Sequence, residues 1–328
     1  MAVDPEVGAT GLVEAPLGGL PVVDAHHHLC DLSGQSYPWL ERPPEQGFPY
    51  HGDDRPIRRD YLVDDYLGDV GDVRLVGSVH IENGAADPRA ETTWLVGLMR
   101  SSRVPSALVA KVDLLTSSAH ADLEWQAGQP GVRGIRQILS WHADPTYSHT
   151  SRNDIIEDPV WRSNFAHLNT LGLSFDLQVY PHQLMQAAEL AATFPDTSLV
   201  LDHAGMPIHR DRDYLDSWHR EMERLADHDN VVCKVSAIGT QDHRWTVESL
   251  RPVVLGAIEA FGPDRTMFAS NFPVDGLYSS YRRLYDAFDQ LTSNFSQDER
   301  SRLFARTAAE VYRLDLRGNE ETTGARRA

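Results

Sequence analysis

The feature that most constrains the fold of this chain is a repeated alternation of short apolar runs with longer amphipathic stretches, from residue 21 to about residue 315. The apolar runs are rich in β-branched residues and predict strands at Val22–His28, Leu75–Glu82, Ala107–Asp113, Gly134–Leu139, Ser174–Tyr180, Ser198–His203, Val231–Ser236 and Thr266–Asn271. The stretches between and after them predict helices at Ala90–Met99, Pro159–Leu171, His182–Thr193, Asp213–Ala226, Glu248–Phe261, Tyr278–Leu291 and Gln297–Tyr312.

Strands that alternate with helices pair in parallel through crossover connections. Eight such strands are the number that closes a (β/α)8 TIM-like barrel. An open doubly wound sheet is the alternative, but no Gly-x-Gly-x-x-Gly turn follows the first strand. We therefore predict a single α/β barrel domain over residues 19–316, a flexible N-terminal tail over residues 1–18 and a polar C-terminal tail over residues 317–328.

Composition limits the class of protein further. With 328 residues, 41% of them hydrophobic, the chain can bury a sizeable core. A formal net charge of −18 argues against a nucleic-acid binder, because clustered Lys and Arg meet a phosphate backbone. Cys30 and Cys233 are too few for a disulfide framework, and the sequence shows neither a signal peptide nor a membrane-spanning apolar run. We expect a cytoplasmic protein with no membrane partner, and self-association is left open.

The first strand is followed by an elongated loop, Gly34–Arg59, which contains five prolines together with aromatic and charged residues. In a barrel this segment is the first βα loop, at the end where active sites lie. It is either a lid over the site or a surface loop without a role. If it is a lid, Trp39 and Tyr50 are the residues that could stack on a ring or exclude water.

The end of the first strand reads Asp-Ala-His-His-His from residue 24. Because side chains alternate faces along a strand, His26 and His28 share one side with Asp24, and His27 points to the other. His203 ends another strand. A single histidine at a strand end is more often a hydrogen-bonded structural residue. Three of them at strand ends that a barrel brings together predict an active site.

The polar residues of the other strands extend this site. If the more apolar face of each strand is turned toward the helices, Val79 and Ile81 point outward and the polar face points inward. The polar residues that this places inside, as candidate substrate contacts, are His80, Arg136, Gln178, Tyr180 and Lys234. Burying such groups without partners costs about 1–3 kcal/mol each, so they must meet one another, water, a metal or a ligand.

Arg136 and Lys234 have a second interpretation. Charges inside a barrel must be paired, so Arg136 could equally be the structural ion-pair partner of Asp176 or Glu82. The same alternative applies to Lys234.

Four segments, in this order, resemble the amidohydrolase superfamily, specifically its amidohydrolase-2 branch, which includes lactonases and decarboxylases. They are Asp24–His28, Val132–Gln137, Leu201–Gly205 and Phe268–Asp275. Tyr37–Leu40 and Pro56–Val70 are similar to the lead-in of sugar-lactone and 2-pyrone-4,6-dicarboxylate lactonases. The resemblance implies a TIM-like barrel with its chemistry at the carboxyl ends of the strands.

The chain departs from the family pattern at two strands. Where the family's eighth-strand motif carries an Asp that binds metal or acts as the base, this chain has Asn271, a poor proton acceptor and a weak metal ligand. Asp275 is the candidate replacement, or else an ordinary turn residue. The fifth strand offers Gln178 and Tyr180 in place of a metal-binding residue. The metal-independent lactonase branch is thus the nearer template.

The resemblance leaves two mechanisms open. Without a metal, cationic and polar residues would grip the substrate and polarise a lactone carbonyl, while His203 with Asp275 would activate water. The residues that would grip the substrate are His26, His28, Arg136, Lys234 and Tyr180. With one divalent metal, Zn²⁺ as the first choice, the ligands would be His26, His28 and His203.

The resulting expectation is a hydrolase that opens a small carboxylated or polyhydroxylated lactone, with Trp39, His80 and Asn271 among the substrate contacts. One alternative is a metal-dependent decarboxylase of an aromatic or unsaturated acid. The other is a catalytically altered ligand-binding barrel, which the amide at position 271 favours.

Overall fold

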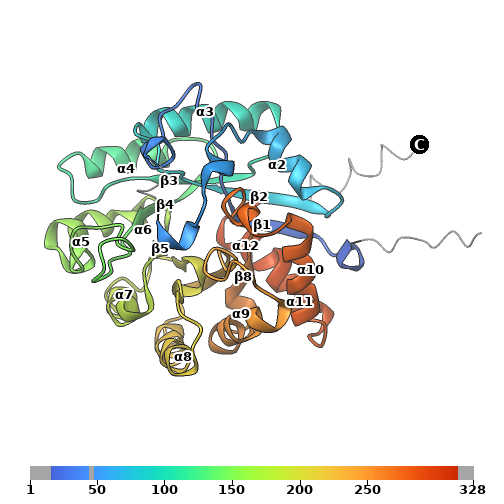
Figure 1. Cartoon of the computed structure of the whole chain (residues 1–328). Coiled ribbons are helices and arrows are strands. Elements are labelled where there is room, and N and C mark those ends of the chain that lie inside the picture. The colour runs from blue at the N-terminus through green and yellow to red at the C-terminus, as the bar shows by residue number, and fades with distance from the viewer. Residues whose placement is uncertain (1–15, 44–47, 317–328) are drawn as a thin grey trace, which may run out of the picture.

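The computed structural model describes residues 16–43 and 48–316 and confirms the α/β barrel (Figure 1). Eight strands form one sheet in chain order, and each neighbouring pair is parallel. The strands are β1 (Val22–His27), β2 (Leu75–Ile81), β3 (Ala107–Lys111), β4 (Val132–Ile138), β5 (Ser174–Gln178), β6 (Leu199–Leu201), β7 (Val231–Val235) and β8 (Thr266–Phe268). Every predicted strand is present, and each ends earlier at its carboxyl end than predicted.

Helices surround the strands as an outer layer (Figure 1). They are α1 (Pro38–Glu41), α2 (Val63–Val70), α3 (Pro88–Ser101), α4 (Ala119–Ala127), α5 (Pro159–Phe165), α6 (His167–Thr170), α7 (Leu184–Thr193), α8 (Arg212–Ala226), α9 (Val247–Phe261), α10 (Tyr281–Leu291), α11 (Gln297–Ser301) and α12 (Thr307–Val311). The last predicted helix is thus present as α11 and α12, joined by a π-helical turn at Arg302–Arg306. No helix of the described residues is long and apolar enough to cross a membrane.

Helix starts follow from local capping chemistry. α3 begins after Asp87, whose carboxylate accepts the N–H groups of Arg89 and Ala90, and α5 begins in the same way after Asp158. In both helices a proline occupies the first helical position, where its missing N–H costs nothing.

Of the two predicted tails, residues 1–15 and 317–328 lie outside the described residues. Pro16–Gly19 form a 3-10 turn, and Leu17 is buried.

The barrel closes between its last and first strands through a short set of contacts. The Asn271 N–H donates to the His26 carbonyl at 2.7 Å, and the His28 N–H donates to the Phe272 carbonyl at 2.8 Å. The carboxylate of Asp24 adds to this seam, since it accepts both the N–H (2.8 Å) and the hydroxyl (2.6 Å) of Ser270. The seam brings the first histidines beside the end of β8.

Asp24 does not share a face with His26, which corrects the sequence-based expectation. Its carboxylate also accepts the hydroxyl of Tyr66 in α2 at 2.8 Å, and the ring of His27 stacks on the same tyrosine. Asp24 and His27 therefore both face the helices. The pairing of β1 with β2 shifts register between these two residues, so simple alternation fails there.

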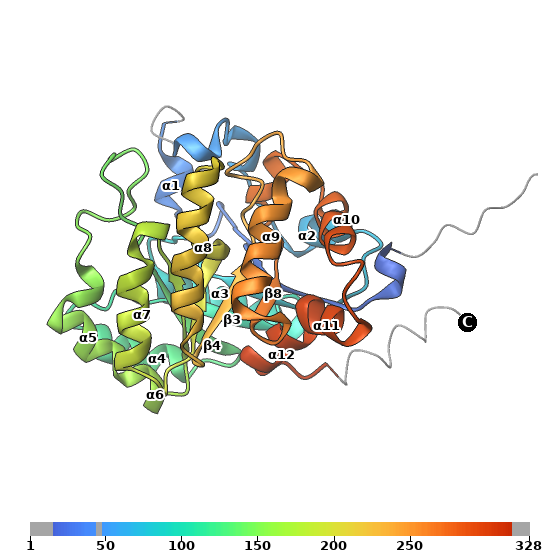
Figure 2. The same cartoon turned by 90° about the horizontal axis from the view of Figure 1, so that it is seen from below.

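The amino-terminal half of the barrel interior is apolar. One hydrophobic cluster joins residues of β1, β2, β3, β6 and β8 with the C-terminal helical segment, and strands so far apart in the sheet can meet only across the interior. Val79 and Ile81 belong to this cluster, so the prediction that they point outward is wrong. Figure 2 shows α12 at one end of the barrel and α1 at the other, which leaves the α1 end for polar groups.

Replacing Asp24 tests the seam. Asp24→Ala is expected to lower the free energy of unfolding by about 3 kcal/mol, because it leaves several buried donors unpaired. Chemical unfolding of the variant measures this, with Asp196→Asn, at an exposed position, as the matched control. A loss no larger than that of the control would contradict the role of Asp24 in closure.

Candidate active site

A cavity of about 380 Å³ lies at the carboxyl ends of the strands, beneath the first loop. Its floor, called here the pocket floor, consists of His28, Arg136, Gln178, His203 and Asn271. Its cover comes from α1 and the turn Pro49–His51, together with residues 83–86 and His149. The elongated first loop is therefore part of the pocket wall.

Hydrogen bonds and ring contacts hold this cover against the barrel. The indole of Trp39 donates to the carbonyl of Asn83 at 2.7 Å. The hydroxyl of Tyr50 lies 2.5 Å from Nε2 of His149, and the ring of Phe48 stacks on the same imidazole at 4.0 Å. Trp39 and Tyr50 thus line the cavity, where they can contact a bound ring or keep water out.

Each histidine of the pocket floor is held in orientation by a hydrogen bond at its Nδ1. Nδ1 of His28 lies 2.8 Å from the carbonyl of Ile81, and Nδ1 of His203 lies 2.8 Å from the hydroxyl of Ser236. Burial lowers the pKa of both, that of His203 to about 3, and the charge of Arg136 lowers both further. Both imidazoles are consequently neutral at pH 7, with Nε2 as the remaining nitrogen.

A network of charged groups, called here the buried charge network, lies under the floor. The ammonium of Lys234 is 2.6 Å from the carboxylate of Asp176 and 2.9 Å from that of Asp202, and all three side chains are fully buried. Nδ1 of His26 lies 3.5 Å from both Lys234 and Asp202. Tyr312 donates to Asp176 at 2.9 Å. Lys234 is therefore fully engaged and does not line the cavity.

The charges of this network determine its protonation states. Burial alone would raise the pKa of Asp202, but Lys234 and His26 hold it well below its usual range. Burial lowers the pKa of His26, and the charge of Lys234 lowers it further. The network thus consists of a charged lysine, an ionised Asp202 and a neutral His26.

Arg136 is paired within the floor, as one of the two interpretations of the sequence anticipates. Its Nε lies 2.8 Å from Oε1 of Glu82, and its Nη1 donates to Oε1 of Gln178 at 3.3 Å. Nη1 also lies 3.9 Å from Asp202. The guanidinium is held in a fixed position at the cavity, with its charge partly compensated.

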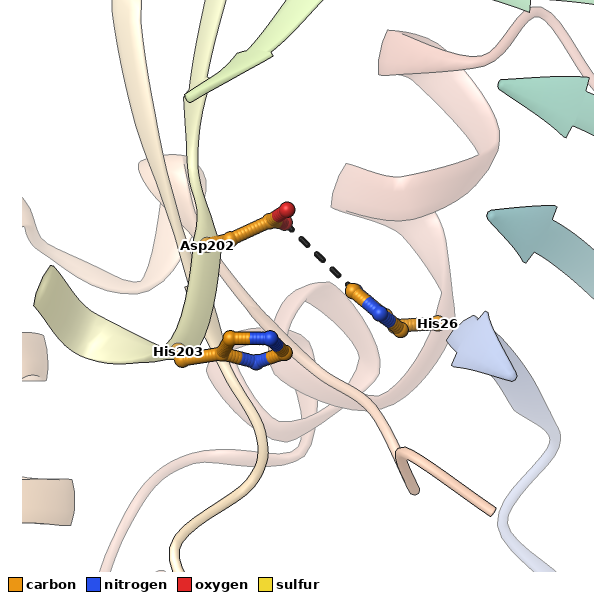
Figure 3. Close-up of side chains that lie close together, drawn as sticks. All are labelled: His26, Asp202 and His203. Carbon is orange, nitrogen blue, oxygen red and sulfur yellow. Dashed lines mark ion pairs between the residues drawn. The ribbon is translucent and has the colours of Figure 1, made fainter. Parts of the chain in front are cut away.

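Three residues present a donor set for a metal ion. The ligand atoms of His26, Asp202 and His203 lie within 4.8 Å of one another, and all three residues are buried (Figure 3). Nε2 of His28 is 3.3 Å from Nε2 of His26, so it lies beside this group. Two neutral imidazoles and an ionised carboxylate are ligands that Zn²⁺ prefers, and neither Asp202 oxygen accepts a well-aligned hydrogen bond from the described residues. The residues fit a divalent metal.

The backbone at the strand ends is strained. His203, Ala237 and Asn271, which follow β6, β7 and β8, have φ angles of 58°, 54° and 57°. For residues other than glycine this left-handed region is costly, and Asn tolerates it best. Such outliers concentrate at functional sites because the surrounding structure holds them in place.

Asn271 and Asp275 form a matched pair. The amide of Asn271 donates to Oδ2 of Asp275 at 2.7 Å, and Oδ1 of Asp275 accepts the N–H of Gly239 at 2.9 Å. Burial raises the pKa of Asp275 to about 7. Asp275 therefore lies behind Asn271, not in the cavity lining, and holds the amide that faces the substrate space.

Two other predicted contacts lie outside the cavity lining. The ring of His80 is beside His27, on the helix-facing side, with Nε2 at 3.3 Å from the carbonyl of Leu29. The hydroxyl of Tyr180 donates to the carbonyl of Tyr147 at 2.7 Å, which places this tyrosine in the wall behind Tyr50. Neither residue contributes to the pocket floor.

Sequence reasoning missed three residues of the site. Asp202 enters only as part of the Leu201–Gly205 segment, although a carboxylate beside a strand-end histidine is itself a signal. Arg42 and Lys111 line the cavity and were not predicted. Lys111 ends β3, and its position at a barrel strand end could have identified it.

A barrel with buried histidines, a charge network and a covered cavity at the strand carboxyl ends defines an enzyme of the TIM-barrel hydrolase type. The Amidohydro_2 family model, described as amidohydrolase, matches residues 23–314. The chain belongs to this family and is a hydrolase.

Named relatives extend over almost the whole chain. The uncharacterized protein y4mH of Sinorhizobium fredii is 38% identical, over 91% of this chain and 100% of its own length. An L-fucono-1,5-lactonase of Burkholderia ambifaria is 28% identical, over 89% of this chain and 96% of its own. An amidohydrolase of Burkholderia multivorans, solved with bound HEPES and with bound zinc, is 28% identical, covers 90% of this chain and 99% of that one, and has a TM-score of 0.75.

Substitutions at Asn271 and Asp275 test whether the two side chains act as a hydrogen-bonded amide–carboxylate pair. Asn271→Asp places two carboxylates together, so one must be protonated or repelled. At pH 5.5 one of the two carboxyl groups is protonated and can donate a hydrogen bond to the other. At pH 8.5 both carboxyl groups are ionised and repel each other. The variant should therefore lose about 2 kcal/mol more unfolding free energy at the higher pH than the parent protein does.

The double variant Asn271→Asp/Asp275→Asn provides the control. Its new amide at position 275 can accept the Gly239 N–H and donate to the new carboxylate at position 271, so the excess pH dependence should disappear. Urea unfolding at both pH values measures this. Equal pH dependence in the single and double variants would show that the two side chains do not act as a pair.

Proposed function

We propose that this protein hydrolyses a small lactone by attack of water on the ring carbonyl. The observation that carries the proposal is His203, a neutral imidazole at the pocket floor whose Nδ1 is fixed by Ser236, so that Nε2 is the nitrogen left for a proton. The relatives named L-fucono-1,5-lactonase, at 28% and 29% identity, support the same reaction class.

The pocket floor supplies the other roles. His203 accepts a proton from the attacking water and returns it to the leaving ring oxygen. The held guanidinium of Arg136 stabilises the negative charge that develops on the carbonyl oxygen, where preorganised donors in a covered site are most effective. Asn271 orients the substrate through its amide. Asp275 acts as a positioning residue for that amide and not as the base.

A divalent metal is compatible with the site and would be held by His26, Asp202 and His203. When bound, Zn²⁺ would polarise a carbonyl and lower the pKa of a coordinated water. Because Ser236 occupies Nδ1 of His203, Nε2 cannot bind a metal and accept a proton at the same time. Metal content and activity measured on one sample therefore decide which role His203 has.

The test of the reaction class is a screen of sugar lactones, pyrones and muconolactones with a pH indicator, because ring opening releases a proton. Activity should be found for at least one lactone. Release of carbon dioxide from aromatic or unsaturated acids, with no lactone opened, would establish the decarboxylase in place of the lactonase.

The residue-level test is His203→Asn, which keeps a side chain that tolerates the left-handed backbone at this position. Lactone hydrolysis should fall by at least about 100-fold, the usual contribution of general acid–base catalysis. The matched control is His120→Asn, at an imidazole that is 52% exposed, which should leave kcat/KM unchanged. Undiminished hydrolysis by the His203 variant would contradict the proposed base.

A further inference from the structure

The charge of the cavity is opposite to the charge of the chain. The whole chain carries a formal net charge of −18. Among the described residues, the cavity is lined by three cationic side chains, Arg42, Lys111 and Arg136, and by no Asp or Glu. A cleft lined by one sign of charge concentrates ligands of the other sign.

Of these three, only Arg136 has ion-pair partners, Glu82 and Asp202, within the part of the chain that the structure describes. Neither Arg42 nor Lys111 has a carboxylate within 4.0 Å among the described residues. Glu91 is close enough for the charge of Lys111 to act on it, but burial raises the pKa of Glu91 to about 8. Glu91 is therefore mostly protonated at pH 7.

The unpaired atoms of Arg42 have the geometry of a carboxylate receptor. Its Nε and Nη2 are shielded from water and have no hydrogen-bond partner among the described residues. These two atoms form the edge of the guanidinium that donates two parallel hydrogen bonds to a carboxylate. Burying such donors without an acceptor is unfavourable, so a carboxylate that reaches this edge of the guanidinium gains both bonds.

Arg42 and Lys111 line the same cavity as His203 and Asn271. Lys111 pairs in register with Arg136 of β4. The guanidinium of Arg42 lies 4.6 Å from the ring centroid of Phe48, which stacks on His149 in the segment after β4. His203 and Asn271 follow β6 and β8. A ligand can thus present its carbonyl to His203 and a second group to the cations.

We propose that Arg42 and Lys111 form a carboxylate subsite, so that the substrate is a lactone bearing a free carboxylate and not a neutral sugar lactone. This inference rests on the proposed lactone hydrolysis for the identity of the reacting group. The recognition of a carboxylate rests on the cavity cations alone, and it can be tested without turnover.

The binding test uses tetrahydrofuran-2-carboxylate and the corresponding neutral carboxamide as probes in calorimetric titrations of the full chain. The carboxylate should bind at least about 10-fold more tightly than the carboxamide, since hydrogen bonds between charged groups are the stronger ones. Arg42→Gln and Lys111→Gln should each remove most of that preference. Arg212→Gln, at a side chain 92% exposed, should not change it.

The kinetic test compares a carboxylated lactone with its methyl ester. In Arg42→Gln and Lys111→Gln, kcat/KM for the acid should fall by about 10-fold or more through KM, while kcat/KM for the ester stays within about 3-fold. Unfolding midpoints equal to that of the parent protein confirm that the variants are folded.

The outcomes separate the two proposals. Hydrolysis of neutral lactones with no preference for a carboxylate, in binding or in kinetics, would overturn the subsite and leave the lactonase standing. Carboxylate binding that depends on Arg42 and Lys111, without hydrolysis of any lactone, would support the subsite and overturn the reaction. Equal binding of carboxylate and carboxamide in the parent protein would also overturn the subsite.

Discussion

Lys234 lies between Asp176 and Asp202 in the closed interior of the barrel, and the arrangement of the site depends on this contact. A buried ammonium costs several kcal/mol unless it is paired, and removal of one partner of a buried pair costs about 3–5 kcal/mol. Because Asp202 also contacts His26 and precedes His203, the pairing fixes where both imidazoles lie. Burial, with the charge of Lys234 added to it, lowers the pKa of His26 and His203, and both are therefore neutral, which is the state that a base or a metal ligand requires.

The barrel separates this polar layer from an apolar one. Below the network, the interior is filled by a cluster that includes Val79, Ile81 and Met267, and the C-terminal segment covers that end. Tyr312 connects the two layers, since its ring packs in the cluster while its hydroxyl reaches Asp176. The apolar layer excludes water from below and the first loop covers the floor from above. The low local polarity strengthens every interaction made by the pocket floor.

The strand periodicity in the sequence was enough to predict the barrel, and alternation correctly placed Arg136, Gln178 and Lys234 inside. It failed for β2, because the side of this strand that carries His80 faces the helices, while its apolar side with Val79 and Ile81 faces an apolar part of the interior. It failed for Asp24 because a register shift in β1 is not visible in the residue pattern. The partners of Arg136 and Lys234 could not be chosen from the sequence either, since several acids lie at equivalent strand positions. Arg42 was missed because its place over the cavity depends on how a long loop folds back.

The central claim is that water attacks a lactone carbonyl in this cavity. It is tested most directly by turnover of an accepted lactone in ¹⁸O-labelled water, with mass spectrometry of the product. Our account predicts one ¹⁸O atom in the new carboxylate of the opened acid and no loss of carbon. Product without the label in that carboxylate, or the release of carbon dioxide, would contradict it.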